Sequence, residues 1–143
     1  MTCVVDASVA VKWFFSKEQY AAEASALLNE TPDLIAPELI VAEACNVAWK
    51  WLRLGRIAAI DLVDIAVNLP RLFAELTGLA ALAPRATAIA AELDHPVYDC
   101  FYLALAEARQ APLVTADCRL LAKLQGSPWA GSATHVVDYR PGG

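Results

Sequence analysis

The sequence lacks the features that mark several large classes of protein. It has four cysteines among 143 residues, none in a C-x-x-C pair, so we expect reduced thiols in a cytosolic protein. No run of about 18 uncharged apolar residues is present, which argues against a membrane-spanning helix. The first residues, MTCVVDAS, lack the basic region and apolar core of a secretory signal. Repeats and low-complexity tracts are also missing, and the length predicts one domain over residues 1–143.

Positive charge is scarce as well. The chain has 11 Lys and Arg against 16 Asp and Glu, a net charge of −5. This argues against a protein that coats nucleic acid, because such proteins are normally basic. It leaves room for a small nucleic-acid site built from a local basic strip and a metal ion. The chain is 58% hydrophobic and 19% charged, which excludes an intrinsically disordered segment.

Short β-branched runs alternate with longer helical patterns. Strands are expected at 2–6, 34–37, 112–117 and 134–139, and helices at 17–30, 38–54, 58–69, 86–93 and 98–109, with a further helix starting near Arg119. Residues 71–76 could continue the helix that Pro70 interrupts, and residues 79–84 fit either a strand or a loop. Alternating strands and helices predict an α/β fold with a mainly parallel sheet. Sites in such sheets form beyond the carboxyl ends of the strands.

Four acidic residues border or interrupt apolar segments. Asp6 ends the first strand, and Asp117 follows the strand residues LVTA at 113–116, where the chain runs into a turn. Asp99 opens an apolar helix, and Glu43 lies inside another. Each aspartate has an ordinary alternative as a helix N-cap, whereas Glu43 is harder to dismiss because an unpaired buried carboxylate is costly. Four such residues together favour one shared site.

A shared site would need a cation, since like charges raise one another's pKa unless something neutralises them. All-oxygen ligands favour Mg²⁺ or Mn²⁺ over zinc. A divalent ion held by carboxylates suits phosphodiester hydrolysis, because it can activate water, orient the phosphate and stabilise the leaving oxygen. The sequence therefore predicts a metal-dependent site at the carboxyl edge of the sheet.

Basic residues accompany two of these acids. On the helix of Glu43, a polar row of Asn46, Lys50 and Arg53 shares its face. The row could lead from the metal to a substrate backbone, although an ordinary solvated face is the alternative. Beyond the fourth acid, Arg119 and Lys123 lie four residues apart and could hold RNA phosphates.

Four segments together resemble the PIN-domain ribonucleases of the VapC toxin type: VVDASVAVKWF, APELIVAEACNVAWK, HPVYDCFYLALAE and LVTADCRLLAKL. They span nearly the whole chain in the order found in that family. The resemblance implies a PIN-like three-layer α/β/α sandwich. It also implies metal ligation by Asp6, Glu43, Asp99 and Asp117, with Asp6 and Asp99 as the expected direct ligands and Ser8, Asn46 and Thr115 as supporting residues.

The same resemblance implies an activity and partners. The activity would be Mg²⁺- or Mn²⁺-dependent endoribonuclease cleavage that leaves 5′-phosphate and 3′-hydroxyl ends. The partners would be an RNA substrate, a VapB-like antitoxin that plugs the site, and a second copy of the chain in a homodimer. The main alternative is a non-catalytic PIN-like module that only binds RNA or protein. A haloacid-dehalogenase-like phosphatase is disfavoured, since it needs a second Asp where this chain has Ser8.

Several other residues invite a functional interpretation. His95 lies four positions before Asp99, but the metal route needs no histidine general base. All four cysteines lie within three positions of one of the four acids and are interpreted as small apolar residues that pack beneath the site. Trp49 and Trp51 face different ways on one helix, so at least one is expected to be exposed, where a partner could bind. The apolar helix near 57–69 is a second candidate for that interface.

Overall fold

The computed structural model describes residues 1–141. Its sheet has five strands, all parallel, in the order β3-β2-β1-β4-β5. Their bounds are β1 Thr2–Val5, β2 Asp33–Pro37, β3 Glu75–Thr77, β4 Leu113–Thr115 and β5 Ala133–His135. The expected α/β fold with a parallel sheet is confirmed.

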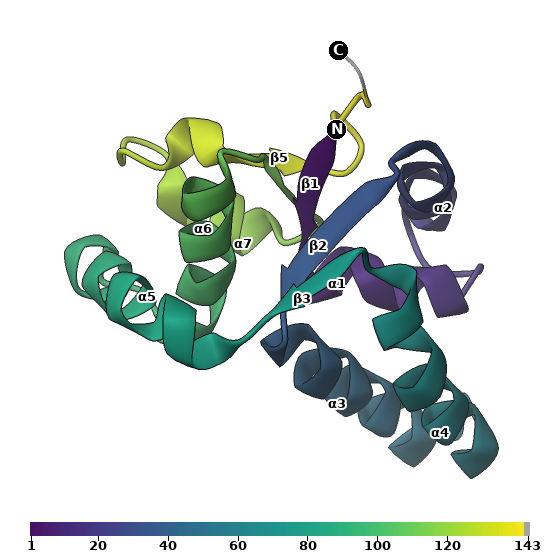
Figure 1. The fold of residues 1–143 in the computed structure, drawn as a ribbon. Coiled ribbons are helices and arrows are strands. Elements are labelled where there is room, and N and C mark those ends of the chain that lie inside the picture. The colour runs from purple at the N-terminus through teal and green to yellow at the C-terminus, as the bar shows by residue number, and fades with distance from the viewer. Residues whose placement is uncertain (142–143) are drawn as a thin grey trace.

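Helices cover both faces of this sheet and give a three-layer α/β/α sandwich. They are α1 Ala7–Ala10, α2 Ala21–Glu30, α3 Leu39–Arg53, α4 Ala59–Asn68, α5 Leu79–Leu93, α6 Val97–Arg109 and α7 Cys118–Leu124, with 3₁₀ segments at Val11–Phe14, Leu69–Leu72 and Ala130–Ser132. In Figure 1, α5 and α6 lie to the left of the strands, α2 lies to the right, and α3 and α4 pack side by side below. Within residues 1–141, none of the helices has the length and apolarity needed to cross a membrane.

The sheet and α6 form much of the core, to which buried residues of the other helices add. The strands β1 and β2 are almost fully buried, which explains their continuous apolar sequences. In α6, five consecutive residues from Tyr102 to Ala106 are buried. Leu103 and Leu105 are the largest aliphatic residues of that run, at 0% and 2% exposure. This rigid centre fixes where the loops at the carboxyl edge of the sheet begin.

Two expected element boundaries are wrong. The helix expected over 17–30 begins only at Ala21, because Tyr20 adopts a left-handed conformation with φ of 64° and separates it from the preceding turn. The last strand, expected over 134–139, is the shorter β5 at Ala133–His135. It ends there because the backbone amides of Asp138 and Tyr139 both donate to the carbonyl of His135, which turns the chain.

The region between α4 and α6 departs further from expectation. Residues 79–84, expected as strand or loop, form the start of the single helix α5, and Pro84 lies inside it. A proline here removes one backbone hydrogen bond, and the burial of Leu82, Ala86 and Ile89 offsets that loss. The expected helical continuation over 71–76 is also wrong, since Glu75 and Leu76 belong to the edge strand β3. Three residues are too few to show a strand pattern in the sequence.

Candidate active site

The strand order creates a switch point between β1 and β4. From β1 the chain moves to β2 on one side, while β4 lies on the other side, and ligands of parallel α/β sheets bind beyond the carboxyl ends of strands at such a point. Asp6 directly follows β1, and Asp117 comes two residues after β4. Helix α6 leads into the amino end of β4, so its first turn, which carries Asp99, lies at the carboxyl edge. Glu43 is in the second turn of α3, which starts at that edge after β2.

Asp6 is the most buried of the four acids, at 5% exposure. Its Oδ2 accepts hydrogen bonds from Thr115 Oγ1 at 2.7 Å and from Ser8 Oγ at 2.9 Å. The Ser8 hydroxyl also accepts from the amide of Ala116, and the Thr115 hydroxyl accepts from the amide of Asp117. Although Asp6 occupies the N-cap position of α1, its side chain makes no capping bond. Its carboxylate is thus held by a network across β1 and β4, which the capping alternative does not explain.

Asp117 does act as a helix cap. Its Oδ1 accepts from the backbone amides of Arg119 at 2.9 Å and Leu120 at 3.2 Å at the start of α7. The interpretation of Asp117 as a helix N-cap is therefore correct for its Oδ1. Capping uses only one of the two carboxylate oxygens, so the cap interpretation and the site interpretation do not exclude each other.

Asp99 is not a cap. Pro96 occupies the N-cap position of α6, and Asp99 lies in the first turn. Its Oδ2 lies 2.6 Å from Nε2 of His95. Both side chains are only partly exposed, at 26% for Asp99 and 16% for His95. His95, which was considered as a general base, instead contacts the carboxylate of Asp99.

Glu43 accepts a hydrogen bond that no sequence pattern predicts. The hydroxyl of Tyr102 donates to Oε1 of Glu43 at 2.6 Å. Tyr102 is 1% exposed and lies three residues after Asp99 on α6. In the sequence, this role of Tyr102 is indicated only by its polar hydroxyl, which lies about one turn after Asp99 beside a run of apolar residues.

The electrostatics link the four acids around Asp6. Burial raises the pKa of Asp6 to about 6, and the charges of Asp99 and Asp117 add to the rise, while the hydrogen bonds from Thr115 and Ser8 oppose it. Burial also raises the pKa of Glu43, with further increases from Asp6 and Asp99 against the lowering effect of Tyr102. Asp6 therefore lies within electrostatic range of each of the other three acids.

The residues present fit a divalent cation. Among residues 1–141, no Lys or Arg side chain forms an ion pair with any of the four acids, and only His95 contacts one. Each carboxylate uses one oxygen to accept protein hydrogen bonds and keeps the other free of them. In the described part of the chain, no three acidic, His or Cys side chains are gathered tightly enough to form a ready-made coordination shell. Mg²⁺ tolerates such a site, because it commonly keeps several waters and uses one or two carboxylates.

The basic residues proposed for substrate contact all lie at the surface. Lys50, Arg53, Arg119 and Lys123 are exposed, as is Asn46. The guanidinium of Arg53 lies 5.2 Å from the ring centroid of Trp49, which is 43% exposed. Trp51 is half-buried instead and packs edge-on against Phe15, with ring centroids 3.9 Å apart.

The cysteines do not share one environment. Cys3 and Cys100 are buried, Cys45 is half-buried and Cys118 is exposed. Burial raises the pKa of Cys3 to about 12 and that of Cys100 to about 11. The expectation of small packing residues holds for these two and is wrong for Cys118, whose thiol is in solvent.

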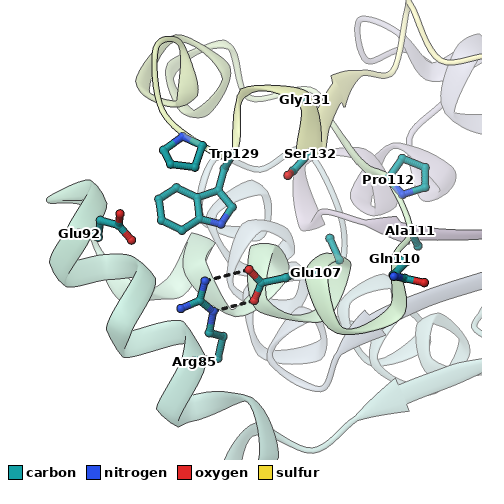
Figure 2. Close-up of a pocket in the computed structure, with 11 residues that line it drawn as sticks. Arg85, Glu92, Glu107, Gln110, Ala111, Pro112, Trp129, Gly131 and Ser132 are labelled. Carbon is teal, nitrogen blue, oxygen red and sulfur yellow. Dashed lines mark hydrogen bonds and ion pairs between the residues drawn. The ribbon is translucent and has the colours of Figure 1, made fainter.

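A hollow of about 600 Å³ lies away from the acids (Figure 2). It is bounded by α5, the end of α6 and residues 128–132, near the amino edge of the sheet where β4 begins. Its guanidinium group, Arg85, is already neutralised by a two-bond ion pair with Glu107, at 2.6 and 2.9 Å. Trp129 and Ser132 line the opposite wall. The hollow therefore offers no unpaired cation for a phosphate.

Comparison with known proteins adds to this geometry. Residues 3–125 match the family model of the PIN domain. The crystal structure of PAE2754 from Pyrobaculum aerophilum is similar, with 25% sequence identity and a TM-score of 0.67 over 96% of this chain and 85% of that one. A toxin–antitoxin complex from Klebsiella pneumoniae is similar in fold, with 18% identity and a TM-score of 0.67 over 94% of this chain and 97% of that one. The comparison with curated proteins gives no match.

Proposed function

The chain belongs to the PIN domain family, whose members are generally nucleases, and on that premise we propose that it is a Mg²⁺- or Mn²⁺-dependent endoribonuclease. We propose further that it is the toxin of a VapBC-type toxin–antitoxin system. The similar fold in a toxin–antitoxin complex supports the second part.

One observation carries the nuclease proposal. The four carboxylates lie at the carboxyl edge of the sheet, and Asp6 is within electrostatic range of the other three. Within residues 1–141, each accepts protein hydrogen bonds through one of its oxygens. Within residues 1–141 their charge is not neutralised by any Lys or Arg. A purely structural carboxylate cluster would be expected to have basic partners, because unpaired buried charge is costly.

Each group then has a distinct task. A bound divalent cation supplies charge neutralisation, an anchor for the phosphate and activation of water. Asp6 and Asp99 would hold it, and Glu43 and Asp117 would complete the acidic set. Ser8 and Thr115 fix the direction of the Asp6 carboxylate through their hydrogen bonds to Oδ2. The exposed basic residues Lys50, Arg53, Arg119 and Lys123 are the proposed contacts for the RNA backbone.

Product analysis tests this proposal. The purified protein, incubated with an RNA pool and Mn²⁺, should yield 5′-phosphate and 3′-hydroxyl ends, and a 2′-deoxy substitution at the cleaved nucleotide should leave cleavage intact. Attack by the 2′-hydroxyl would instead give 2′,3′-cyclic phosphate ends, and detection of those ends as the only products would reject the mechanism.

An exposed apolar surface supports an antitoxin partner. On α4, Ile60, Val63 and Val67 are 69%, 61% and 49% exposed, and their spacing places them on one helix face. We call these three residues the α4 stripe. A cleft of about 550 Å³, lined by aromatic residues that include Phe14 and Phe15, lies between the 14–18 segment and the α3–α4 connection. Contiguous exposed apolar surface of this kind marks interaction sites.

Co-expression with the expected VapB-like antitoxin tests that surface. Size-exclusion chromatography should show a complex that Val63→Asp disrupts, whereas Ala88→Asp on the exposed face of α5 should leave it intact. Equal complex formation by both variants would remove the α4 stripe from the interface. A dimer of the protein alone that only Val63→Asp dissociates would show that a second copy covers the stripe.

A further inference from the structure

We infer that Tyr102 is a positioning residue of the site, which holds Oε1 of Glu43 so that Oε2 is presented to the cation. The inference rests on the proposed metal-dependent function and assigns a role to a residue that none of the sequence motifs singled out.

The geometry for this role is specific. Tyr102 belongs to α6 and Glu43 to α3, 59 positions earlier, so their 2.6 Å hydrogen bond joins two separate helices. The phenol ring is 1% exposed and packs in the core. A side chain anchored in this way has little freedom, and a hydroxyl at its end fixes its partner more firmly than a mobile surface group would.

The phenol can only donate to Glu43. The Tyr102 hydroxyl donates to Oε1 of Glu43 in the structure, and a phenol keeps its proton at physiological pH. Glu43 Oε1 must therefore be the acceptor. Because Tyr102 is the donor that contacts Glu43 among residues 1–141, removing its hydroxyl leaves both carboxylate oxygens without a fixed direction.

Comparable donors hold the other three acids. Ser8 and Thr115 hold Asp6, His95 contacts Asp99, and backbone amides of α7 hold Asp117. Tyr102 completes this set for Glu43. Outer partners of this kind orient metal ligands, and their loss typically weakens metal affinity by roughly 10- to 100-fold. Helix α6 would thus supply one metal ligand directly, through Asp99, and orient a second one through Tyr102.

A double-mutant cycle on Mn²⁺ affinity tests the inference without an activity assay. Isothermal titration calorimetry would measure the Mn²⁺ dissociation constant of the wild type, Tyr102→Phe, Glu43→Gln and the double variant. We expect Tyr102→Phe to weaken binding by roughly 10-fold or more, and to have no further effect in the Glu43→Gln background. The matched control is Tyr98→Phe on the same helix, where the side chain is 60% exposed, and it should bind Mn²⁺ as the wild type does.

Each outcome decides the matter. A folded Tyr102→Phe variant with unchanged Mn²⁺ affinity would overturn the inference while leaving the nuclease proposal in place. Equal weakening by Tyr102→Phe with and without Glu43 would also overturn it, because the hydroxyl would then act through general packing. A wild type that does not bind Mn²⁺ at millimolar concentration would reject the inference and the metal-dependent function together.

A second measurement does not depend on the variant's folding. In wild-type protein labelled with 3-fluorotyrosine, the ¹⁹F signal of Tyr102 should shift as Mg²⁺ is added, while that of Tyr139, which lies near Met1 and Cys3, should not. The signal of Tyr102 can be assigned by elimination with variants of the other tyrosines. A Tyr102 signal that stays fixed at saturating Mg²⁺ would contradict the inference.

Discussion

Replacing Asp6 with asparagine should change how the stability of the metal-free protein depends on pH. In the folded protein, burial raises the pKa of Asp6 from 3.8 to about 6. A shift of this size corresponds to about 3 kcal/mol of unfavourable free energy for the ionised carboxylate. Asparagine is nearly isosteric and stays neutral, and its carbonyl can still accept the hydrogen bonds of Ser8 and Thr115. The variant therefore lacks this electrostatic cost.

The direction follows from proton linkage. Because the folded pKa is higher than the unfolded one, the native state binds more protons, and stability falls as pH rises. The contribution of Asp6 is fully present below pH 3.8 and is lost as the pH passes about 6. Between pH 4 and pH 8 the wild type should therefore lose about 2 kcal/mol of unfolding free energy relative to Asp6→Asn, because the unfolded carboxyl is already more than half ionised at pH 4.

Urea denaturation at both pH values, in the presence of EDTA, measures this difference. Asp138→Asn, which replaces an exposed carboxylate, is the control and should follow the wild type at both pH values. Adding Mg²⁺ at 100 times its dissociation constant should restore about 2.7 kcal/mol to the wild type at pH 8, and nothing comparable to Asp6→Asn. An Asp6→Asn variant whose stability tracks the wild type from pH 4 to pH 8 would refute the electrostatic reasoning.

Three further predictions concern other parts of the molecule. His95→Ala should weaken Mn²⁺ binding by roughly 10-fold because Asp99 loses its contact, and calorimetry that finds wild-type affinity would contradict this role. Leu103→Ala should cost about 2–5 kcal/mol of unfolding free energy, since Leu103 is fully buried. The control Leu54→Ala, at a position that is 71% exposed, should change the unfolding free energy by no more than about 0.5 kcal/mol. Urea denaturation measures both values. Iodoacetamide should label the exposed Cys118 far faster than the buried Cys3, whose pKa is raised to about 12. Peptide mass spectrometry measures the two labelling rates, and equal rates would show that the core around Cys3 opens readily.

The sequence was most informative where hydrophobic patterns are long. The strand at 2–6, the helix of Glu43 and the helix of Asp99 were predicted nearly at their true bounds, because each buries a continuous apolar face. The expectation of a strand or loop at 79–84 is wrong, because tertiary burial keeps α5 helical through Pro84. The three-residue β3 was missed because its pairing with β2, rather than any local pattern, defines it.

The candidate site was also predictable from the sequence only in part. Placing Asp6 and Asp117 at strand ends required only the rule for parallel sheets, and the structure brings them within electrostatic range. The donors that hold the carboxylates could not be read in the same way. The contact between Tyr102 and Glu43 joins residues 59 positions apart, and a single sequence carries no sign of such a pairing. The roles of the four acids as metal ligands stay a prediction.

Cleavage of a mixed RNA pool is the measurement that tests the central claim most directly. The wild type would be compared with Asp6→Asn and Asp99→Asn, each with Mn²⁺ and with EDTA, after circular dichroism has shown that all three are folded. The account predicts cleavage by the wild type with Mn²⁺, none with EDTA, and none by either variant. Cleavage that persists in a folded Asp6→Asn or Asp99→Asn variant, or in EDTA, would contradict a metal-dependent nuclease centred on these carboxylates.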